Sequence, residues 1–173
     1  MNTGTNITMT LVETLDTDTQ QELSRLLMAV VDDGASIGFL PPLQETEARE
    51  YWQNVIQPGV LLWIARENNT IVGTIQLHFV SKPNGRHRVE IAKLMVHPQH
   101  RRKGIAGALM ATVEAAAQAE KKELLVLDTR EGDPSNILYL SLGYVEAGRI
   151  PYFARSGSGS LDTTVLYYKK LEY

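Results

Sequence analysis

Residues 94–107 read Leu94-Met95-Val96-His97-Pro98-Gln99-His100-Arg101-Arg102-Lys103-Gly104-Ile105-Ala106-Gly107, and this stretch decides the fold. The apolar run that ends at Val96 has the character of a strand, and the proline at position 98 prevents its continuation. Three consecutive cations follow, and Gly104 then opens a segment with helical periodicity. The stretch therefore predicts a strand, a basic turn and the beginning of a helix.

The basic turn has the features of an anion-binding site. Unpaired amides at a helix N-terminus attract a negative charge, and the small residues Gly104, Ala106 and Gly107 let a phosphate approach the backbone. Cations are disfavoured at a helix N-terminus, so the three at 101–103 indicate an anionic partner. The alternative is a solvated basic turn. Neither G-x-x-x-x-G-K-[ST] nor G-x-G-x-x-G occurs in the sequence.

Working outward from this stretch, apolar periodicity predicts one mixed α/β domain over residues 1–173, with a twisted sheet of about seven strands and about four helices. Asp18 is the expected N-cap of the first helix, and Asn68-Asn69 and Asn84-Gly85 are expected hairpin turns. No repeat or linker divides the chain. We expect strands near 7–11, 61–66, 71–80, 89–96, 124–127, 145–150 and 164–171, and helices near 18–31, 105–121 and 135–142. A further short helix is expected to run through Trp52 and Ile56 and to end at Pro58-Gly59.

Composition excludes several classes of function. The 173 residues are 43% apolar and carry a net charge of −3, so neither nucleic acid nor an anionic membrane is the expected partner. The absence of cysteine excludes a disulfide framework, a zinc-thiolate site and a cysteine nucleophile. The N-terminus lacks the pattern of a signal peptide, and the apolar stretch 60–65 is too short to span a bilayer. We expect a cytoplasmic protein without a metal site.

The pattern Arg101-x-x-Gly104-x-Ala106 resembles the R/Q-x-x-G-x-G/A signature of the GCN5-related N-acetyltransferases, in the strand-turn-helix setting of that family. Many members have glycine where this chain has Ala106. Further blocks resemble the tabtoxin-resistance type of acetyltransferase, which implies a role in toxin or antibiotic resistance. These are Gly34-Ala35-Ser36-Ile37-Gly38-Phe39, Lys82-Pro83-Asn84-Gly85, Arg88-x-Glu90-x-x-Lys93-Leu94-Met95-Val96, Leu127-Asp128-Thr129 and Tyr144-x-x-x-Gly148-x-x-Pro151.

The resemblance implies that acetyl-CoA is the acetyl donor. In the family its pantetheine arm pairs with the strand before the turn, here at Leu94, Met95 and Val96. Such an arm would add to an open sheet edge like an extra strand. The resemblance places the diphosphate on the backbone amides of Arg102, Lys103, Gly104, Ile105, Ala106 and Gly107. The side chains of Arg101, Arg102 and Lys103 would screen its charge from outside.

Two carboxylates are candidates for the general base that deprotonates the acceptor amine. Glu90 lies in an otherwise apolar strand, where a carboxylate is costly unless it faces a cleft or is paired. Strand alternation predicts that Glu90 and Lys93 lie on opposite faces. Asp128 is the rival, since it ends a buried strand at the edge where α/β proteins bind ligands; it could also hold the substrate amine. The alternatives are a glutamate paired with a neighbouring strand and an aspartate that caps a turn.

Tyr139 is the candidate acid for the departing thiolate. It lies three residues after Asn136, so the two side chains share a helix face. The segment resembles the family's N-x-x-(F/Y)-Y helix, whose Asn contacts the cofactor arm and whose Tyr faces the thioester sulfur. A core tyrosine is the alternative. The oxyanion would be stabilised by a backbone N–H near Val96.

We expect acceptor selection by the loop Ser36–Phe39, the helix that contains Trp52, and the segment 151–153. The expected acceptor is a primary amine of a small molecule, such as an amino-acid-like toxin or antibiotic, and the expected protein is a monomer or a homodimer. Three alternatives remain open: a non-catalytic acyl-CoA sensor, an acetyltransferase for protein or peptide amines, and a nucleotide-binding module that uses the basic turn. The four histidines show no metal-ligand spacing.

Overall fold

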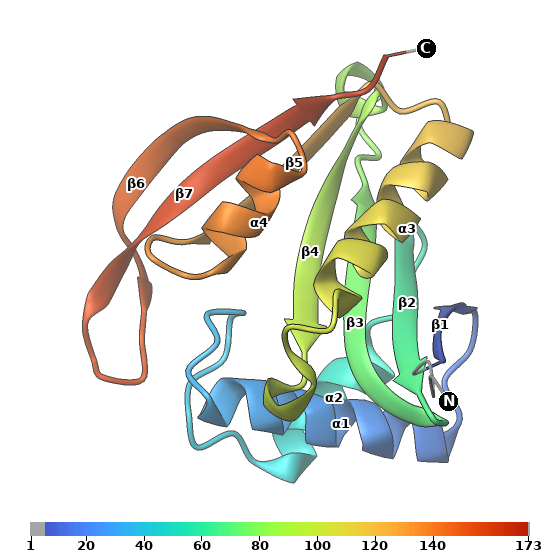
Figure 1. Cartoon of the computed structure of the whole chain (residues 1–173), viewed down its shortest axis with the longest axis vertical. Helices are drawn as coiled ribbons and strands as arrows, with labels where there is room; N and C mark the ends of the chain where they lie inside the picture. The colour runs from blue at the N-terminus through green and yellow to red at the C-terminus, as the bar shows by residue number, and fades with distance from the viewer. Residues whose placement is uncertain (1–5, 173) are drawn as a thin grey trace, which may run out of the picture.

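One mixed sheet runs through the molecule, with strand order β1-β2-β3-β4-β5-β7-β6 (Figure 1). The computed structural model describes residues 6–172, and the expected domain limits of 1–173 extend past this range at both ends. Within it the strands are β1 (Ile7–Val12), β2 (Val60–Glu67), β3 (Thr70–Phe79), β4 (Arg88–Val96), β5 (Leu124–Arg130), β6 (Val145–Arg155) and β7 (Leu161–Lys170). The α-helices are α1 (Thr17–Asp32), α2 (Glu45–Gln53), α3 (Ile105–Ala119) and α4 (Ser135–Ser141). Two 3₁₀ turns, η1 (Pro83–Gly85) and η2 (Pro98–His100), complete the set. The predicted fold class is confirmed.

The β2–β3 hairpin forms where the sequence predicts it. Asn68 and Asn69 have φ angles of 50° and 66°, the left-handed pair that a two-residue hairpin turn requires. Asparagine tolerates this conformation better than most residues because its short polar side chain can bond locally.

Two apolar cores lie on opposite faces of the sheet. The first packs α3 and α4 against the sheet and includes Val89, Ile91 and Leu109; α3 lies in front of the sheet in Figure 1. The second packs α1 and α2 against the other face and includes Leu27, Trp52 and Met95. Side chains of β4 therefore contribute to both cores: Val89 and Ile91 to the core beneath α3, and Met95 to the core beneath α1 and α2.

The sheet opens between β4 and β5. These strands are parallel neighbours, as a strand-helix-strand crossover requires, but they pair only over Arg88–Glu90 and Leu124–Val126. Beyond Glu90 they separate, and Figure 1 shows the gap widening away from the end where they meet. The rest of β4 therefore pairs on one side only, with β3.

Three local predictions were wrong. Asp16, not Asp18, caps α1, since its Oδ1 accepts a bond of 2.7 Å from the Thr19 N–H. The second helix ends at Gln53 and does not reach Ile56. Asn84-Gly85 forms no tight hairpin turn; it lies in the 3₁₀ turn η1, where neither residue has a positive φ.

Candidate active site

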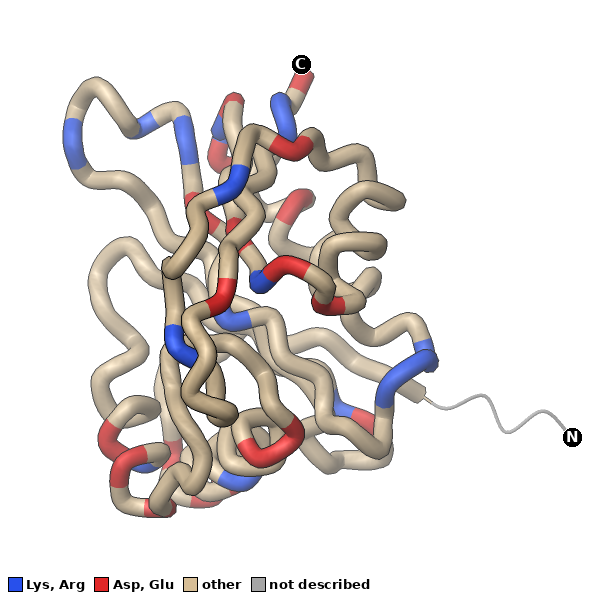
Figure 2. The backbone as a smooth tube through the Cα atoms, turned by 90° about the vertical axis from the view of Figure 1, so that its left-hand side faces the viewer, with Lys and Arg blue, Asp and Glu red and all other residues tan. Residues whose placement is uncertain are grey.

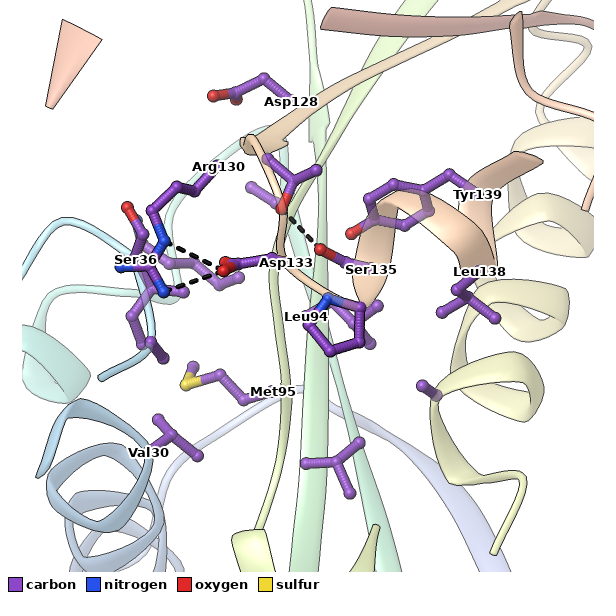
Figure 3. Close-up of a pocket in the computed structure, with 18 of the residues that line it drawn as sticks. Val30, Ser36, Leu94, Met95, Asp128, Arg130, Asp133, Ser135, Leu138 and Tyr139 are labelled. Carbon is purple, nitrogen blue, oxygen red and sulfur yellow. Dashed lines mark hydrogen bonds and ion pairs between the residues drawn. The ribbon is translucent and has the colours of Figure 1, made fainter. Parts of the chain in front are cut away.

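A cavity of about 730 Å³ occupies the gap between β4 and β5. Its volume is typical of pockets for small ligands and cofactors, which measure about 300–1,000 Å³. The lining comes from the loop after α1, the end of β4, the basic turn with the start of α3, the β5–α4 segment, and the β6–β7 hairpin. Figure 3 shows Met95 and Val30 at one end of this space and Asp128 and Arg130 at the other.

The start of α3 offers free backbone amides to the cavity. Gly104 is the N-cap, with a φ of 79° that favours glycine, and Arg102 before it has a φ of 63°. The N–H groups of Ile105, Ala106 and Gly107 lack intrahelical partners, as in any first helical turn, and all three residues line the cavity. A Cβ added at Gly107 would meet nothing within 4 Å, so the space above these amides is open. This geometry fits a phosphate group.

The three cations of the turn have three different environments. Arg101 pairs with Asp33 at the end of α1, with 2.6 Å between Nη1 and Oδ2. Lys103 turns away from the cavity, because its ammonium bonds both oxygens of Glu67 at 3.0 Å. Arg102 has no hydrogen bond or ion pair with another residue of 6–172, and it lines the cavity. Figure 2 shows the turn as an unbroken blue run below α3.

Glu67 was not recognised as a site residue from the sequence. It ends β2, is only 5% exposed, and accepts bonds from Lys103 Nζ and, at 2.5 Å, from His100 Nδ1. The bond from Lys103 and the bond with His100 hold the pKa of its carboxyl below the usual 4.5, against the opposing effect of burial. Glu67 therefore fastens both ends of the basic turn to β2. The sequence predicted the hairpin turn Asn68-Asn69 that follows Glu67. It did not show that His100 and Lys103, more than 30 residues away, would bond Glu67.

A β-bulge distorts β4 where it lines the cavity. Gln76 of β3 pairs with Ala92, and Thr74 with Met95, so β4 contains one residue more than β3 between these pairs. Lys93 takes a left-handed φ of 54° at this point. The bulge breaks the alternation on which the sequence argument relied, and Lys93 lies within electrostatic reach of Glu90 and Asp128. The predicted separation of Lys93 from Glu90 on opposite faces is therefore wrong.

The free edge of β4 faces the cavity at Leu94 and Val96. The N–H of His97 donates to the Val72 carbonyl on β3, at 2.8 Å. Because successive backbone groups of a strand point to opposite edges, the N–H of Val96 points away from β3, into the gap. Met95 also lines the cavity, although its side chain is buried in the core beneath α1 and α2.

Glu90 and Asp128 share one face of the sheet. Their neighbours Val89 and Leu127 are buried in the core beneath α3, so both carboxylates point to the other face, and both line the cavity. His78 is the direct cross-strand partner of Glu90. Burial lowers the pKa of His78, while the charge of Glu90 opposes that shift. The Oδ2 of Asp128 accepts a bond of 2.7 Å from the Thr164 hydroxyl.

Tyr139 approaches the cavity from the opposite face. Its ring is packed against Tyr144 and Tyr167 and is 5% exposed, and Figure 3 shows its hydroxyl directed toward the space between α4 and β4. Burial, followed by the charges of Asp128 and Asp133, raises the pKa of Tyr139 well above its usual 10.0. The hydroxyl therefore keeps its proton throughout the physiological range.

Asn136 shares a helix face with Tyr139, as predicted, but its side chain is engaged within the protein. Its Nδ2 donates to the carbonyls of Arg130 and Asp133, both at 2.8 Å, and its Oδ1 accepts from the Tyr167 hydroxyl at 2.8 Å. Both amide hydrogens are used, so the side chain closes the turn before α4 and has no donor left for a cofactor arm.

The expected acceptor-selecting residues divide into two groups. Ser36 lines the main cavity, and so does Phe153 of β6. Phe39 stacks edge-on against Tyr51 at 5.2 Å and lines a smaller adjoining pocket. Trp52 is fully buried, so it contributes to the core and cannot contact an acceptor. Arg130 joins the walls of the cavity by pairing with Asp133, at 2.9 Å (Figure 3), and with Asp162.

Residues 6–172 contain no group of three or more His, Asp or Glu side chains arranged to hold a metal ion. No helix in the same range has both the length and the hydropathy needed to cross a bilayer.

Comparison with known proteins agrees with this geometry. The chain is 33% identical over 93 residues to N-acetyltransferase 8F1 of Mus musculus, covering 53% of this chain but only 42% of that protein. It is 28% identical over 130 residues to an uncharacterized N-acetyltransferase from the hisH-hisA intergenic region of Azospirillum brasilense, covering 73% of this chain and 77% of the relative. The chain thus spans less than half of the first mammalian relatives it matches.

Solved structures show the same fold at low sequence identity. An N-acetyltransferase from Staphylococcus aureus Mu50 superimposes with a TM-score of 0.81 at 15% identity, covering 96% of this chain and 99% of that one. A putative acetyltransferase from Salmonella typhimurium, yncA, solved with its cofactor acetyl-CoA, gives 0.78 at 19% identity, with 97% and 95% coverage. The model of the acetyltransferase (GNAT) family matches residues 16–144, well over half of the chain. This chain belongs to the GNAT family of acetyltransferases.

Proposed function

We propose that this protein is an acetyl-CoA-dependent N-acetyltransferase that acts on a primary amine of a small molecule. One observation carries the proposal: a single cavity joins the free amides of α3, the open edge of β4, and proton-handling groups from both faces of the sheet. Membership of the GNAT family supports the reaction type.

The residues present fit acetyl-CoA. Its diphosphate would lie on the amides of Ile105, Ala106 and Gly107, with the unpaired Arg102 beside them. Its pantetheine amides would bond the free edge of β4 at Leu94 and Val96. When bound, acetyl-CoA supplies the thioester carbonyl that the amine attacks. Ala106 lines the cavity at a half-buried position, so its methyl group would contact the cofactor.

Glu90 would serve as the general base. Its carboxylate lines the cavity and forms no ion pair with another residue of 6–172, so it is available to take a proton from the acceptor ammonium. Asp128 is already bonded to Thr164, which suits it better to holding the amine than to accepting its proton. The neutral amine then attacks the acetyl carbon directly, which agrees with the absence of cysteine.

Val96 and Tyr139 would stabilise the negative charge that develops on the acetyl oxygen and on the thioester sulfur. The N–H of Val96 would donate to the acetyl carbonyl oxygen as it becomes negative. The hydroxyl of Tyr139 would donate to the sulfur as the C–S bond breaks. Since the pKa of Tyr139 is raised above that of a typical thiol, about 8.5, the hydroxyl favours hydrogen bonding to the thiolate over complete transfer of its proton.

The acceptor end of the cavity supports a small molecule. The loop at Ser36, Phe153 and Arg130, with its ion pairs to Asp133 and Asp162, all line this end of the cavity and lie close enough together to contact one small acceptor. The blocks that resemble the tabtoxin-resistance type supply Ser36, Glu90 and Asp128 to this end. We therefore propose an amino-acid-like amine, such as a toxin or antibiotic.

The test is release of free thiol from acetyl-CoA in the presence of a panel of small amines and of peptides with free N-termini. We expect turnover with at least one small amine and none with the peptides. Tight binding of acetyl-CoA without turnover would indicate an acyl-CoA sensor. Equal affinity for ADP and acetyl-CoA, with binding of oligonucleotides that weakens steeply with salt, would indicate the nucleotide-binding module instead.

A further inference from the structure

The acceptor end of the cavity contains an ammonium group that the reaction does not use. Lys93 lines the cavity, is half-buried, and forms no hydrogen bond or ion pair with another residue of 6–172. Its Nζ lies 3.4 Å from the position that a Cβ on Gly38 would take, so it reaches across from β4 to the loop after α1. Burial lowers the pKa of Lys93, against the opposing charges of Asp128 and Glu90.

The backbone conformation at Lys93 indicates that the surrounding structure fixes the direction of its side chain. A lysine with a φ of 54° is strained, and strained residues persist where the surrounding structure imposes them, commonly at ligand sites. Regular strand alternation would place Lys93 on the face opposite Glu90, in the core beneath α3. The bulge instead brings its ammonium to the same end of the cavity as the two carboxylates.

The charged groups that line the cavity separate into paired and unpaired groups. Arg130 forms ion pairs with both Asp133 and Asp162, and Arg101 forms one with Asp33. At the acceptor end, the charged groups of residues 6–172 that line the cavity without an ion pair are the carboxylates of Glu90 and Asp128 and the ammonium of Lys93. A lysine that served only to balance those carboxylates would form an ion pair with one of them; Lys93 forms none within 4 Å.

We propose that Lys93 binds an anionic group of the acceptor, so that the preferred acceptor is a zwitterion whose amine lies at Glu90 and Asp128 and whose carboxylate lies at Lys93. This inference rests on the proposed acetyltransferase function and narrows its substrate class. A zwitterion satisfies both unpaired charge types at once, whereas a simple amine leaves the Lys93 ammonium without a partner.

The experiment compares each amino acid with the amine formally obtained by removing its carboxylate: lysine with cadaverine, tyrosine with tyramine, and histidine with histamine. For wild-type protein we expect at least one pair in which kcat/KM for the amino acid exceeds that for the amine by about 10- to 100-fold, the range for a charge-assisted hydrogen bond. This arm needs no variant, so it does not depend on how a substitution affects folding.

Three variants assign the preference to Lys93. Lys93→Gln is expected to lower kcat/KM for the amino acid by the same factor and to leave the matched amine unchanged, while Lys93→Arg retains the preference. Lys121→Gln is the matched control, because Lys121 also has a left-handed φ, of 53°, but lies exposed beyond the far end of α3. Unchanged affinity for CoA in each variant confirms that the fold is retained.

Two results would overturn the proposal alone: amines acetylated as well as their amino acids by wild-type protein, or an equal fall for both members of a pair in Lys93→Gln. The second would show that Lys93 acts on the carboxylates of the protein. Failure to acetylate any amine of either set, with CoA bound, would overturn the proposed function as well.

Discussion

Glu90 lies on the cavity side of β4, directly across from His78 on β3. If Glu90 is the general base, Glu90→Gln should lower kcat by about 10²–10⁴-fold, the usual contribution of general base catalysis. The KM for acetyl-CoA should stay the same, because the amides proposed to hold its diphosphate belong to α3. Steady-state thiol release with saturating amine measures both quantities.

The control for this substitution is Glu13→Gln, an exposed glutamate in the segment before α1. It should leave kcat unchanged. Full activity in Glu90→Gln, with loss of activity in Asp128→Asn, would move the base to Asp128.

At Lys93, a single extra residue in β4 makes the prediction from strand alternation wrong. Strand alternation assigns side chains to faces by counting, and the count fails when a bulge adds one residue. A lysine is not a residue that favours a left-handed φ, so nothing in the local sequence indicated the bulge. Asn136 is a similar case: its spacing to Tyr139 was predictable, but the carbonyls that engage its amide belong to a turn whose shape the sequence did not show.

Among the helices and strands, the start of α3 has two features that separate substitutions can test: the positive φ of Gly104 and the open space beside Gly107. Gly104→Ala should destabilise the protein by about 1–2 kcal/mol, because its φ of 79° places a Cβ against the following carbonyl.

Gly107→Ala should not destabilise the protein, since Gly107 lies inside the helix and a Cβ there meets nothing within 4 Å. Its methyl group would instead enter the proposed phosphate site and raise the KM for acetyl-CoA. Urea unfolding and steady-state kinetics distinguish the two effects; a destabilised Gly107→Ala with unchanged KM would contradict this assignment.

The link between β2 and the basic turn is the second testable element. Glu67→Gln keeps the shape of the side chain but removes the charge that holds Lys103 and His100. The turn should shift, and the KM for acetyl-CoA should rise by up to about 10²-fold, the cost of misplacing binding groups by about 1 Å. The kcat at saturation should change little. Lys103→Gln should give a similar but smaller effect if Lys103 acts through Glu67 and not on the phosphate.

The same link predicts a pH dependence of stability. The pKa of Glu67 is below its usual 4.5 in the folded protein, so the folded state favours the charged form. Its contribution to the free energy of unfolding is then present above pH 4.5 and is lost as the pH falls below 4.5 through the lowered pKa. Urea unfolding of wild-type protein and Glu67→Gln should therefore differ most near neutral pH and converge in acid. A difference that grows in acid would contradict the ion-pair interpretation.

At the scale of the whole molecule, the sheet is joined across the β4–β5 gap over only a short register. A ligand that bonds β4, α3 and α4 should therefore stabilise the fold as a unit. At 100 times its Kd, acetyl-CoA should add about 2.7 kcal/mol, which corresponds to a rise in Tm of about 5–10 °C for a chain of this size. Thermal unfolding with acetyl-CoA measures the shift, and ADP at the same concentration, which lacks the pantetheine arm and should bind more weakly, should give a smaller one. A shift of equal size with inorganic pyrophosphate would show that the β4 edge contributes nothing.

The order of strands and helices was readable from the sequence because it depends on local periodicity and on turn residues such as Asn68-Asn69. The wrong predictions arose where two local signals favoured different structures. Asp16 and Asp18 both lie near the start of α1, and Asp16 is the N-cap. Pro83 favours a 3₁₀ turn, whereas Asn84-Gly85 favours a hairpin turn. The strand-turn-helix around Gly104 was likewise predictable from the sequence, through the conformational freedom of glycine and the amides that every helix leaves unpaired.

Only the tertiary structure decided which charges are free to act. Glu67 takes Lys103 out of the cavity, Asp33 takes Arg101, and Arg130 is shared between Asp133 and Asp162. All of these pairs except Arg130–Asp133 join residues that are far apart in the sequence. An ion pair requires the two charges to be close in space, and the sequence does not show which distant residues meet. The sequence indicated where an anion and a carboxylate would be useful; within residues 6–172, folding leaves Arg102, Glu90, Lys93 and Asp128 as cavity-lining charged groups without an ion pair.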